Sequence, residues 1–250
     1  MKQLSLTKSR KFLSAVGLIV VSLLANIIPA KIALATEIPV FLDNVGTLLS
    51  AMLGGTLPAV IVGFFSNVIN GFSNWETLYY GIISILIGVA AALFQQYGFY
   101  KTISRICIVI VTFALLGGGL GSILTYFLYG YDFGEGISAP FSLAIYQHLG
   151  FSKFFSQLSA DFVIDMIDKT IVVATSLLIY RNIPVKFKSL FSNVFLFDPH
   201  LGEHSRKSGS HLIKRSLLRK VVVMVIVAEI LLGALASTTG FILYRQATIA

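Results

Sequence analysis

The chain has 250 residues, of which 56% are hydrophobic and only 12% are charged, and its mean hydropathy is +0.86. Soluble domains average about 25% charged residues, so this composition argues against a soluble protein and predicts an all-α polytopic membrane protein. The net charge of +8 does not indicate nucleic-acid binding, because the basic residues flank apolar segments. The lone Cys107 lies in an apolar run and offers neither a disulfide nor a metal cluster.

The apolar runs predict seven membrane-spanning helices, because a helix needs about 20 apolar residues to cross a bilayer. The first run could instead be a signal peptide, but it exceeds the roughly 7–15 residues of a signal core, so an uncleaved helix is favoured. The glycine run 117–121 predicts a close helix crossing or a local break in the fifth span. The predicted spans are approximately residues 12–35, a pair forming a hairpin within 39–74, and then 78–96, 103–129, 158–183 and 221–244.

The basic residues set the expected orientation. Most of the 19 lysines and arginines fall on the cytoplasmic side when the N-terminus is placed there, as the positive-inside rule requires. We therefore expect a multi-pass protein of a bacterial cell membrane with a cytoplasmic N-terminus. In this orientation the polar residues of the hairpin and of the sixth span all approach the outer surface.

The hairpin from Pro39 to Asn74 carries polar groups that a hydrocarbon environment disfavours. Its two apolar segments are joined by a tight Gly-Gly-Thr-Leu-Pro turn, which brings the outer ends of both segments to one membrane level. A polar cluster at that level predicts a buried binding site for a small solute. The polar residues are Asp43 and Asn44 on the first segment, and Ser66, Asn67 and Asn70 on the second.

The sixth span carries a charged face. Asp161, Asp165 and Asp168 follow i, i+4, i+7 spacing, and Lys169 lies four residues after Asp165 and can pair with it. Charge within a span costs about 2.5–3.5 kcal/mol per residue on insertion scales and usually faces a cavity or a partner. Either Asp165 or Asp168 binds the solute while Lys169 sets the local charge, or these residues form a structural ion pair with Asp161 solvated at the interface.

Other polar residues of the predicted site also allow structural interpretations. Asp43 is equally suited to cap the second helix and to line a pocket. Asn67 and Asn70 are equally suited to join helices by hydrogen bonds. Four aromatic residues could stack on a flat ligand, although an aromatic belt at the membrane interface is favoured: Trp75, Tyr79, Tyr80 and Tyr126.

At these residues the chain resembles the substrate-binding S components of energy-coupling-factor (ECF) transporters. The resemblance covers roughly residues 12–184 and rests on FLDNVGTLLSAMLGG, on P-x-x-x-x-G-F-F-S-N-V-I-N, and on D-x-x-D-K from Asp165 to Lys169 followed by Ile183-Pro184. It implies a six-helix membrane domain that binds a vitamin-like solute near its outer end. It also implies a membrane T component and two cytoplasmic ATPases as partners. The first span departs from the family by lacking the Ala-x-x-x-Ala pattern used for docking.

The C-terminal part lies outside the six-helix pattern, so we divide the chain into a solute-binding domain (1–184), a basic cytoplasmic linker (185–220) and an additional spanning helix (221–250). The linker is expected to attract anionic lipid, at about 1 kcal/mol per basic residue. Its His200 and His204 have helical metal-ligand spacing but lie in a Gly- and Ser-rich segment, so no metal is expected. Glu229, near the middle of the last span, is expected either to face another helix or to be neutralised by burial.

Three functions are compatible with these features. The first is solute uptake as an S component. The second is ligand sensing by the N-terminal region of a larger signalling protein whose output domain would follow Ala250. The third is proton-coupled transport through Glu229 or Asp165, for which no internal repeat is found by eye. No enzyme activity and no cofactor are expected, because no catalytic motif occurs in the sequence. The candidate ligand-binding residues are Asp43, Asn67, Asn70, Asp165, Asp168 and Lys169.

Overall fold

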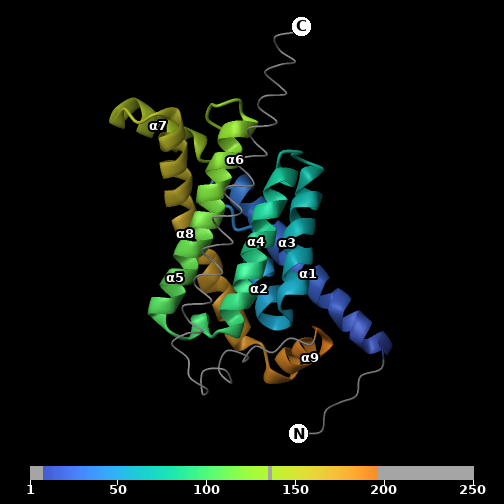
Figure 1. The fold of residues 1–250 in the computed structure, drawn as a ribbon. Coiled ribbons are helices and arrows are strands. Elements are labelled where there is room, and N and C mark those ends of the chain that lie inside the picture. The colour runs from blue at the N-terminus through green and yellow to red at the C-terminus, as the bar shows by residue number, and fades with distance from the viewer. Residues whose placement is uncertain (1–7, 135–136, 196–250) are drawn as a thin grey trace.

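The computed structural model describes residues 8–134 and 137–195, and every regular element in this part of the chain is a helix. The helices stand side by side as a bundle, with the start of α1 and the whole of α9 at one end and α7 at the other (Figure 1). The predicted span 221–244, with Glu229, lies outside the described residues, as do linker residues 196–220. The principal helices are α1 (Lys8–Ala35), α2 (Val45–Gly54), α3 (Thr56–Gly71), α4 (Thr77–Gln96), α5 (Ile103–Ala114), α6 (Gly121–Leu128), α7 (Ala139–Leu149), α8 (Lys153–Asn182) and α9 (Val185–Phe195).

Three helical segments of the described chain are long and apolar enough to cross a membrane: Ser9–Ala35, Thr77–Gln96 and Ile103–Leu128. They match the predicted first, fourth and fifth spans. The third of them is continuous helix built from α5, the π-helical segment η2 (Leu115–Leu120) and α6. Much of α1 presents exposed apolar side chains, such as Phe12, Val20 and Ile32, as expected for a helix surrounded by lipid.

The hairpin differs from its prediction, because α2 has only 10 residues and its partner α3 has 16. At 1.5 Å per residue, α2 is about 15 Å long, roughly half of the ~30 Å hydrocarbon core. Every residue of α2 is buried, so it is an internal helix and the expectation of a full second span is wrong. The turn is also tighter than predicted. Gly55 alone separates the two helices, at a φ of 84° that glycine adopts without a Cβ penalty.

A stretch of irregular backbone, residues 36–44, leads from α1 to α2. Such backbone is tolerated at membrane depth only where protein groups satisfy its hydrogen bonds. The Asp168 carboxylate of α8 does so here, because its Oδ1 accepts from the backbone N–H of Phe41 at 2.8 Å and of Leu42 at 2.7 Å. Leu42 has a φ of 51°, which is uncommon for a non-glycine residue, and these two bonds hold it in place.

The N-terminus of α2 is capped from another helix. Asn26 of α1 accepts the backbone N–H groups of Gly46 and Thr47, at 2.6 and 3.2 Å, and its own amide donates to the hydroxyls of Thr47 and Ser66. The proposed cap Asp43 does not fill this role, since the N-cap position belongs to Asn44 and carries no side-chain cap bond. Asn26 therefore joins α1, α2 and α3, which makes α1 an integral part of the bundle.

The glycine run produces the predicted close crossing, while the helix continues through it in π-helical form without a break. Residues 115–120 form a π-helical turn, a feature that often marks functional sites. A Cβ on Gly118 would lie only 2.7 Å from the backbone of Asp161 and Phe162, so the two helices touch backbone to backbone at this point. The absence of side chains thus brings η2 against α8, which carries the acidic face.

Two helices near the end of the domain complete the bundle. The stretch 130–157, for which no helix was predicted, contains α7, and this helix packs on α8. In the middle of α8, Asp161, Asp165, Asp168 and Lys169 are buried, whereas the following apolar residues are exposed: Val163, Ile167, Ile171 and Leu178. The helix therefore turns its charges inward and an apolar stripe outward, which is the arrangement expected of the predicted sixth span.

Candidate solute-binding site

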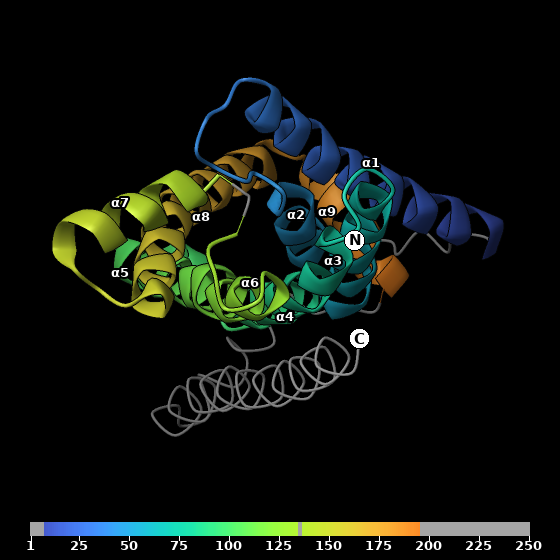
Figure 2. The same cartoon turned by 90° about the horizontal axis from the view of Figure 1, so that it is seen from above.

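A cavity of about 260 Å³ lies inside the bundle, within the end that carries α7 in Figure 1. Helices α2, α4, α6 and α8 surround this region when it is viewed from above (Figure 2). Its wall combines residues before α2 with residues of α3, α4, η2, α6 and α8. Five of the six predicted site residues line it: Asp43, Asn67, Asn70, Asp165 and Lys169.

The charged part of the wall is organised by Lys169. Its ammonium group lies 2.6 Å from Asp168 Oδ2 and 3.4 Å from Asp165 Oδ1, and all three side chains are almost completely buried. The predicted pairing of Lys169 with Asp165 is present, but the shorter contact is with Asp168. Lys169 also lies 5.9 Å from the centre of the Phe41 ring, within the range of a cation–π interaction.

Asp168, the sixth predicted site residue, does not line the cavity. It is fully buried, and its two oxygens accept from Lys169, Phe41 and Leu42. These contacts tie the irregular segment before α2 to α8, so Asp168 acts as a structural partner of Lys169. The two alternatives proposed for the acidic face thus apply to different residues: Asp168 forms the structural ion pair, whereas Asp165 lines the cavity.

The opposite part of the wall consists of uncharged polar groups. Asn67 of α3 donates its amide to the Ser84 hydroxyl of α4 at 2.8 Å and to the Gly63 carbonyl at 2.9 Å. It therefore joins two helices, as one of its two predicted roles requires, and it also lines the cavity. Asn70 lies one turn further along α3, is half-buried, and lines the same wall.

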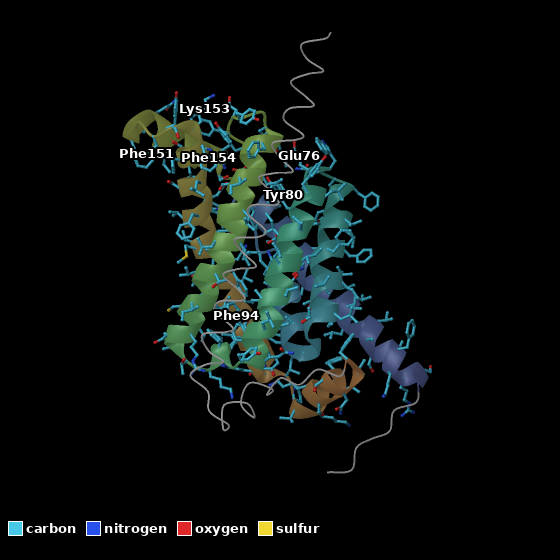
Figure 3. The ribbon with its side chains drawn as sticks, in the orientation of Figure 1. Glu76, Tyr80, Phe94, Phe151, Lys153 and Phe154 are labelled. Carbon is cyan, nitrogen blue, oxygen red and sulfur yellow. The ribbon has the colours of Figure 1, made fainter. Side chains whose placement is uncertain are left out.

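Aromatic side chains extend the wall toward the end of the bundle. Tyr80 lines the cavity, and its hydroxyl lies 2.5 Å from the Thr125 hydroxyl of α6. Nearer the end, the Tyr129 hydroxyl donates to the Glu76 carboxylate (Glu76 and Tyr80 are labelled in Figure 3). Trp75 and Tyr79, by contrast, are exposed and form an edge-to-face pair, as a belt would. The favoured belt interpretation therefore does not hold for Tyr80.

Asp161 lies on the same face of α8, near the α7 end of the cavity. Both of its carboxylate oxygens accept from the Gln157 amide at 2.9 Å, and that amide also reaches the Ser138 hydroxyl at 3.1 Å. Asp161 is 7% exposed, so it is not the solvated interface residue that the alternative interpretation required.

Neither the structural role of Asn26 nor the place of Glu76 in the cavity wall was predicted from the sequence, and for Tyr80 the belt was favoured over contact with a ligand. A signal was available for Asn26, because it is a lone amide in a long apolar run and intramembrane polar residues usually have partners. No comparable signal exists for Glu76, and none separates Tyr80 from its aromatic neighbours, because both stand among residues typical of a membrane interface.

Comparison with models of known protein families, with curated proteins and with solved structures finds no match to this chain. The fold and the site therefore define a broad class of protein. In its described part, the chain is an all-helical bundle that has helices suited to span a membrane and a polar cavity in its interior.

Proposed function

We propose that this protein binds a small solute inside the membrane, in a pocket that opens outward, and delivers it as the S component of an ECF-type uptake system. The observation that carries the proposal is the polar cavity within an apolar bundle. Burying polar groups in such an environment costs free energy, and polar residues inside a membrane commonly mark a functional site. A concave site with a few convergent polar groups is the usual form of a small-molecule site.

The distribution of charge supports the outward orientation. The basic residues Lys101, Arg105 and Arg181 lie near helix ends remote from the cavity, on the side where α1 begins (Figure 1). The positive-inside rule assigns that side to the cytoplasm. The cavity then lies toward the outer surface, where an uptake protein meets its solute. Partnership with a T component and two ATPases rests on the sequence resemblance alone.

The test of solute binding uses two glycines that the structure distinguishes. A side chain on Gly121 or on Gly119 would meet no atom within 4 Å of its Cβ, but only Gly121 lines the cavity. Gly121→Leu should therefore fill the cavity without disturbing helix packing, and Gly119→Leu is the matched control. The protein would be purified in lipid nanodiscs, and the released small molecules identified by mass spectrometry.

We expect a defined solute from the wild type and from Gly119→Leu, and none from Gly121→Leu. The absence of any solute, even after incubation with a library of vitamins and other metabolites, would overturn the proposal. Uptake is then tested by co-expression with a T component and the ATPases. A stable complex with ATP-dependent accumulation in proteoliposomes supports an S component. Binding without accumulation or complex formation would favour the sensing alternative.

A further inference from the structure

Carboxyl groups outnumber basic groups in the lining of the cavity. Its lining residues include four carboxylates and one basic side chain, Lys169. Among the described residues, that lining holds neither arginine nor histidine. The four carboxylates belong to Asp43, Glu76, Asp161 and Asp165.

The one lysine does not offset this excess, because Asp168 already binds it from behind the cavity wall. The contact to Asp168 is 2.6 Å, and the side chain of Asp168 is completely buried. Lys169 and Asp168 thus form the closer ion pair, in which the ammonium charge is balanced by one carboxylate. The 3.4 Å contact adds the Asp165 carboxylate to an ammonium group that already has a counter-ion. The carboxylates of the lining remain as surplus.

Two lining residues also hold acceptor oxygens that receive no hydrogen bond from the described residues. These are Asp165 Oδ2 and Asn44 Oδ1, and each residue is only 2% exposed. A buried acceptor left without a partner costs about 1–3 kcal/mol. Both unpaired groups are acceptors, so the complementary ligand must bring donors.

The carboxylates are not arranged for a metal ion. Among the described residues, no three His, Cys, Asp or Glu side chains come close enough together to hold one. The other wall offers uncharged groups, among them Asn67, Ser84 and Tyr80, that suit the polar or flat remainder of an organic molecule. This asymmetry separates Asp43, Asp165 and Lys169 from an uncharged stretch of wall on α3 and α4, with Glu76 at the start of α4.

We propose that the solute is a small organic cation with N–H donors, such as an ammonium or a guanidinium group, and that its cationic end binds at Asp165 and Asp43. This inference rests on the proposed solute-binding function and narrows it to one chemical class. The neutral end of the solute lies against α3 and α4.

The test compares matched probes that differ in charge or in donors. Methyl-, butyl- and benzylguanidine are paired with the corresponding ureas, which keep the shape and lose the charge. Benzylamine is paired with benzyltrimethylammonium, which keeps the charge and lacks N–H donors, and phenylacetate supplies an anion. Binding to the full chain in lipid nanodiscs is measured by isothermal titration calorimetry.

We expect at least one guanidine to bind on the order of tenfold or more tightly than its urea, and benzylamine to bind more tightly than benzyltrimethylammonium. Asp165→Asn should weaken guanidine binding by about 10- to 100-fold and change urea binding by less than about threefold. Asp132→Asn removes an exposed carboxylate outside the cavity and should change neither. Asp43→Asn is the second cavity variant if Asp165→Asn fails to fold.

Equal binding of guanidines and ureas by the wild type, or preferential binding of phenylacetate, would overturn the cation assignment. A neutral or anionic solute that is released from the wild type and lost in Gly121→Leu would do the same, while leaving the solute-binding function intact. The absence of any bound solute or probe would overturn both proposals. The two failures are therefore distinguishable.

Discussion

The two ends of the bundle differ in the side chains that fill their interiors. Toward the end near α9, Phe94 packs against Phe99 and Phe113 with ring centres 4.9 and 5.9 Å apart, and none of the three is more than 2% exposed. Toward the other end, the interior holds carboxylates, amides and hydroxyls around a cavity. Figure 3 shows Phe94 in the lower part and Tyr80 and Glu76 in the upper part.

This contrast indicates that the aromatic end stabilises the fold and that the polar groups around the cavity destabilise it. Close packing of large apolar side chains stabilises a helix bundle in lipid by van der Waals contact. Unpaired buried acceptors and surplus charge do the opposite. Substitutions at the aromatic end should therefore lower stability, and substitutions among the surplus charges of the cavity should lower binding.

The largest loss of stability is expected from Phe94→Ala. This side chain is completely buried among aromatic neighbours, so its removal leaves a cavity and should lower the free energy of unfolding by about 3–5 kcal/mol. Phe72→Ala is the control, because Phe72 is 88% exposed, and it should change the value by less than about 0.5 kcal/mol. Steric trapping in bicelles measures both. Comparable losses in the two variants would contradict the account of the aromatic end.

The second prediction separates two neighbouring acids of α8. Asp168→Asn should destabilise the protein by about 2–3 kcal/mol, because Lys169 loses its shorter ion pair, while the amide oxygen can still accept from Phe41 and Leu42. Asp165→Asn should leave stability unchanged or raise it, since Asp165 Oδ2 has no partner among the described residues.

The same unfolding measurement, combined with titration of benzylguanidine, checks this pair. Asp168→Asn should lower the free energy of unfolding and change the affinity for benzylguanidine little. Asp165→Asn should lower that affinity and leave the free energy of unfolding unchanged or higher. The reverse pattern would show that the assignment of structural and ligand-binding roles on α8 is inverted.

The sequence predicted well those features that depend on spacing along one element. The acidic face of α8, the close crossing at the glycine run and the common level of Asp43, Asn67 and Asn70 all follow from helical periodicity and hairpin geometry. The lengths of the long spans follow from hydropathy. Which acid is structural could not be predicted, because Asp165 and Asp168 differ only in what lies opposite them.

The features that sequence reasoning missed depend on contacts between distant segments. The apolar run that forms α2 has the composition of a spanning helix, yet it is a short internal helix because the segment before it is irregular and is held by Asp168. The cap of α2 comes from Asn26, about 20 residues earlier, rather than from the adjacent acid. Local propensity does not contain such information.

The third prediction concerns that cap. Asn26→Ala leaves the N–H groups of Gly46 and Thr47 without their acceptor and should destabilise the protein by about 1–2 kcal/mol. Ser14→Ala, in the same helix, is the control and should have little effect because, within the described part of the chain, its exposed hydroxyl bonds only the Arg10 carbonyl one turn earlier. Hydrogen exchange of the α2 amides should accelerate in Asn26→Ala alone. Unchanged exchange would mean that α2 is held by packing without this cap.

The smallest effect is expected at the exposed ion pair that joins the α6–α7 connection to the start of α8. Lys153 lies 2.8 Å from Asp132, and this hydrogen bond lowers the pKa of Asp132 below its ordinary value of 3.8. A carboxyl whose pKa is lowered on folding adds stability above its unfolded-state pKa and loses that contribution as the pH falls through the folded-state pKa.

The difference in melting temperature between wild type and Asp132→Asn should therefore be small, constant between about pH 5 and about pH 8, and should shrink as the pH falls below about 4. Salt should reduce it, because both side chains are exposed and screened by solvent ions. Thermal unfolding of the two proteins across this pH range, at low and high salt, measures it. A large difference that persists at low pH would mean that Asp132 holds the α6–α7 connection by something other than its charge. The polar surface of this end would then contribute to stability as the aromatic end does, which would remove the contrast between the two ends.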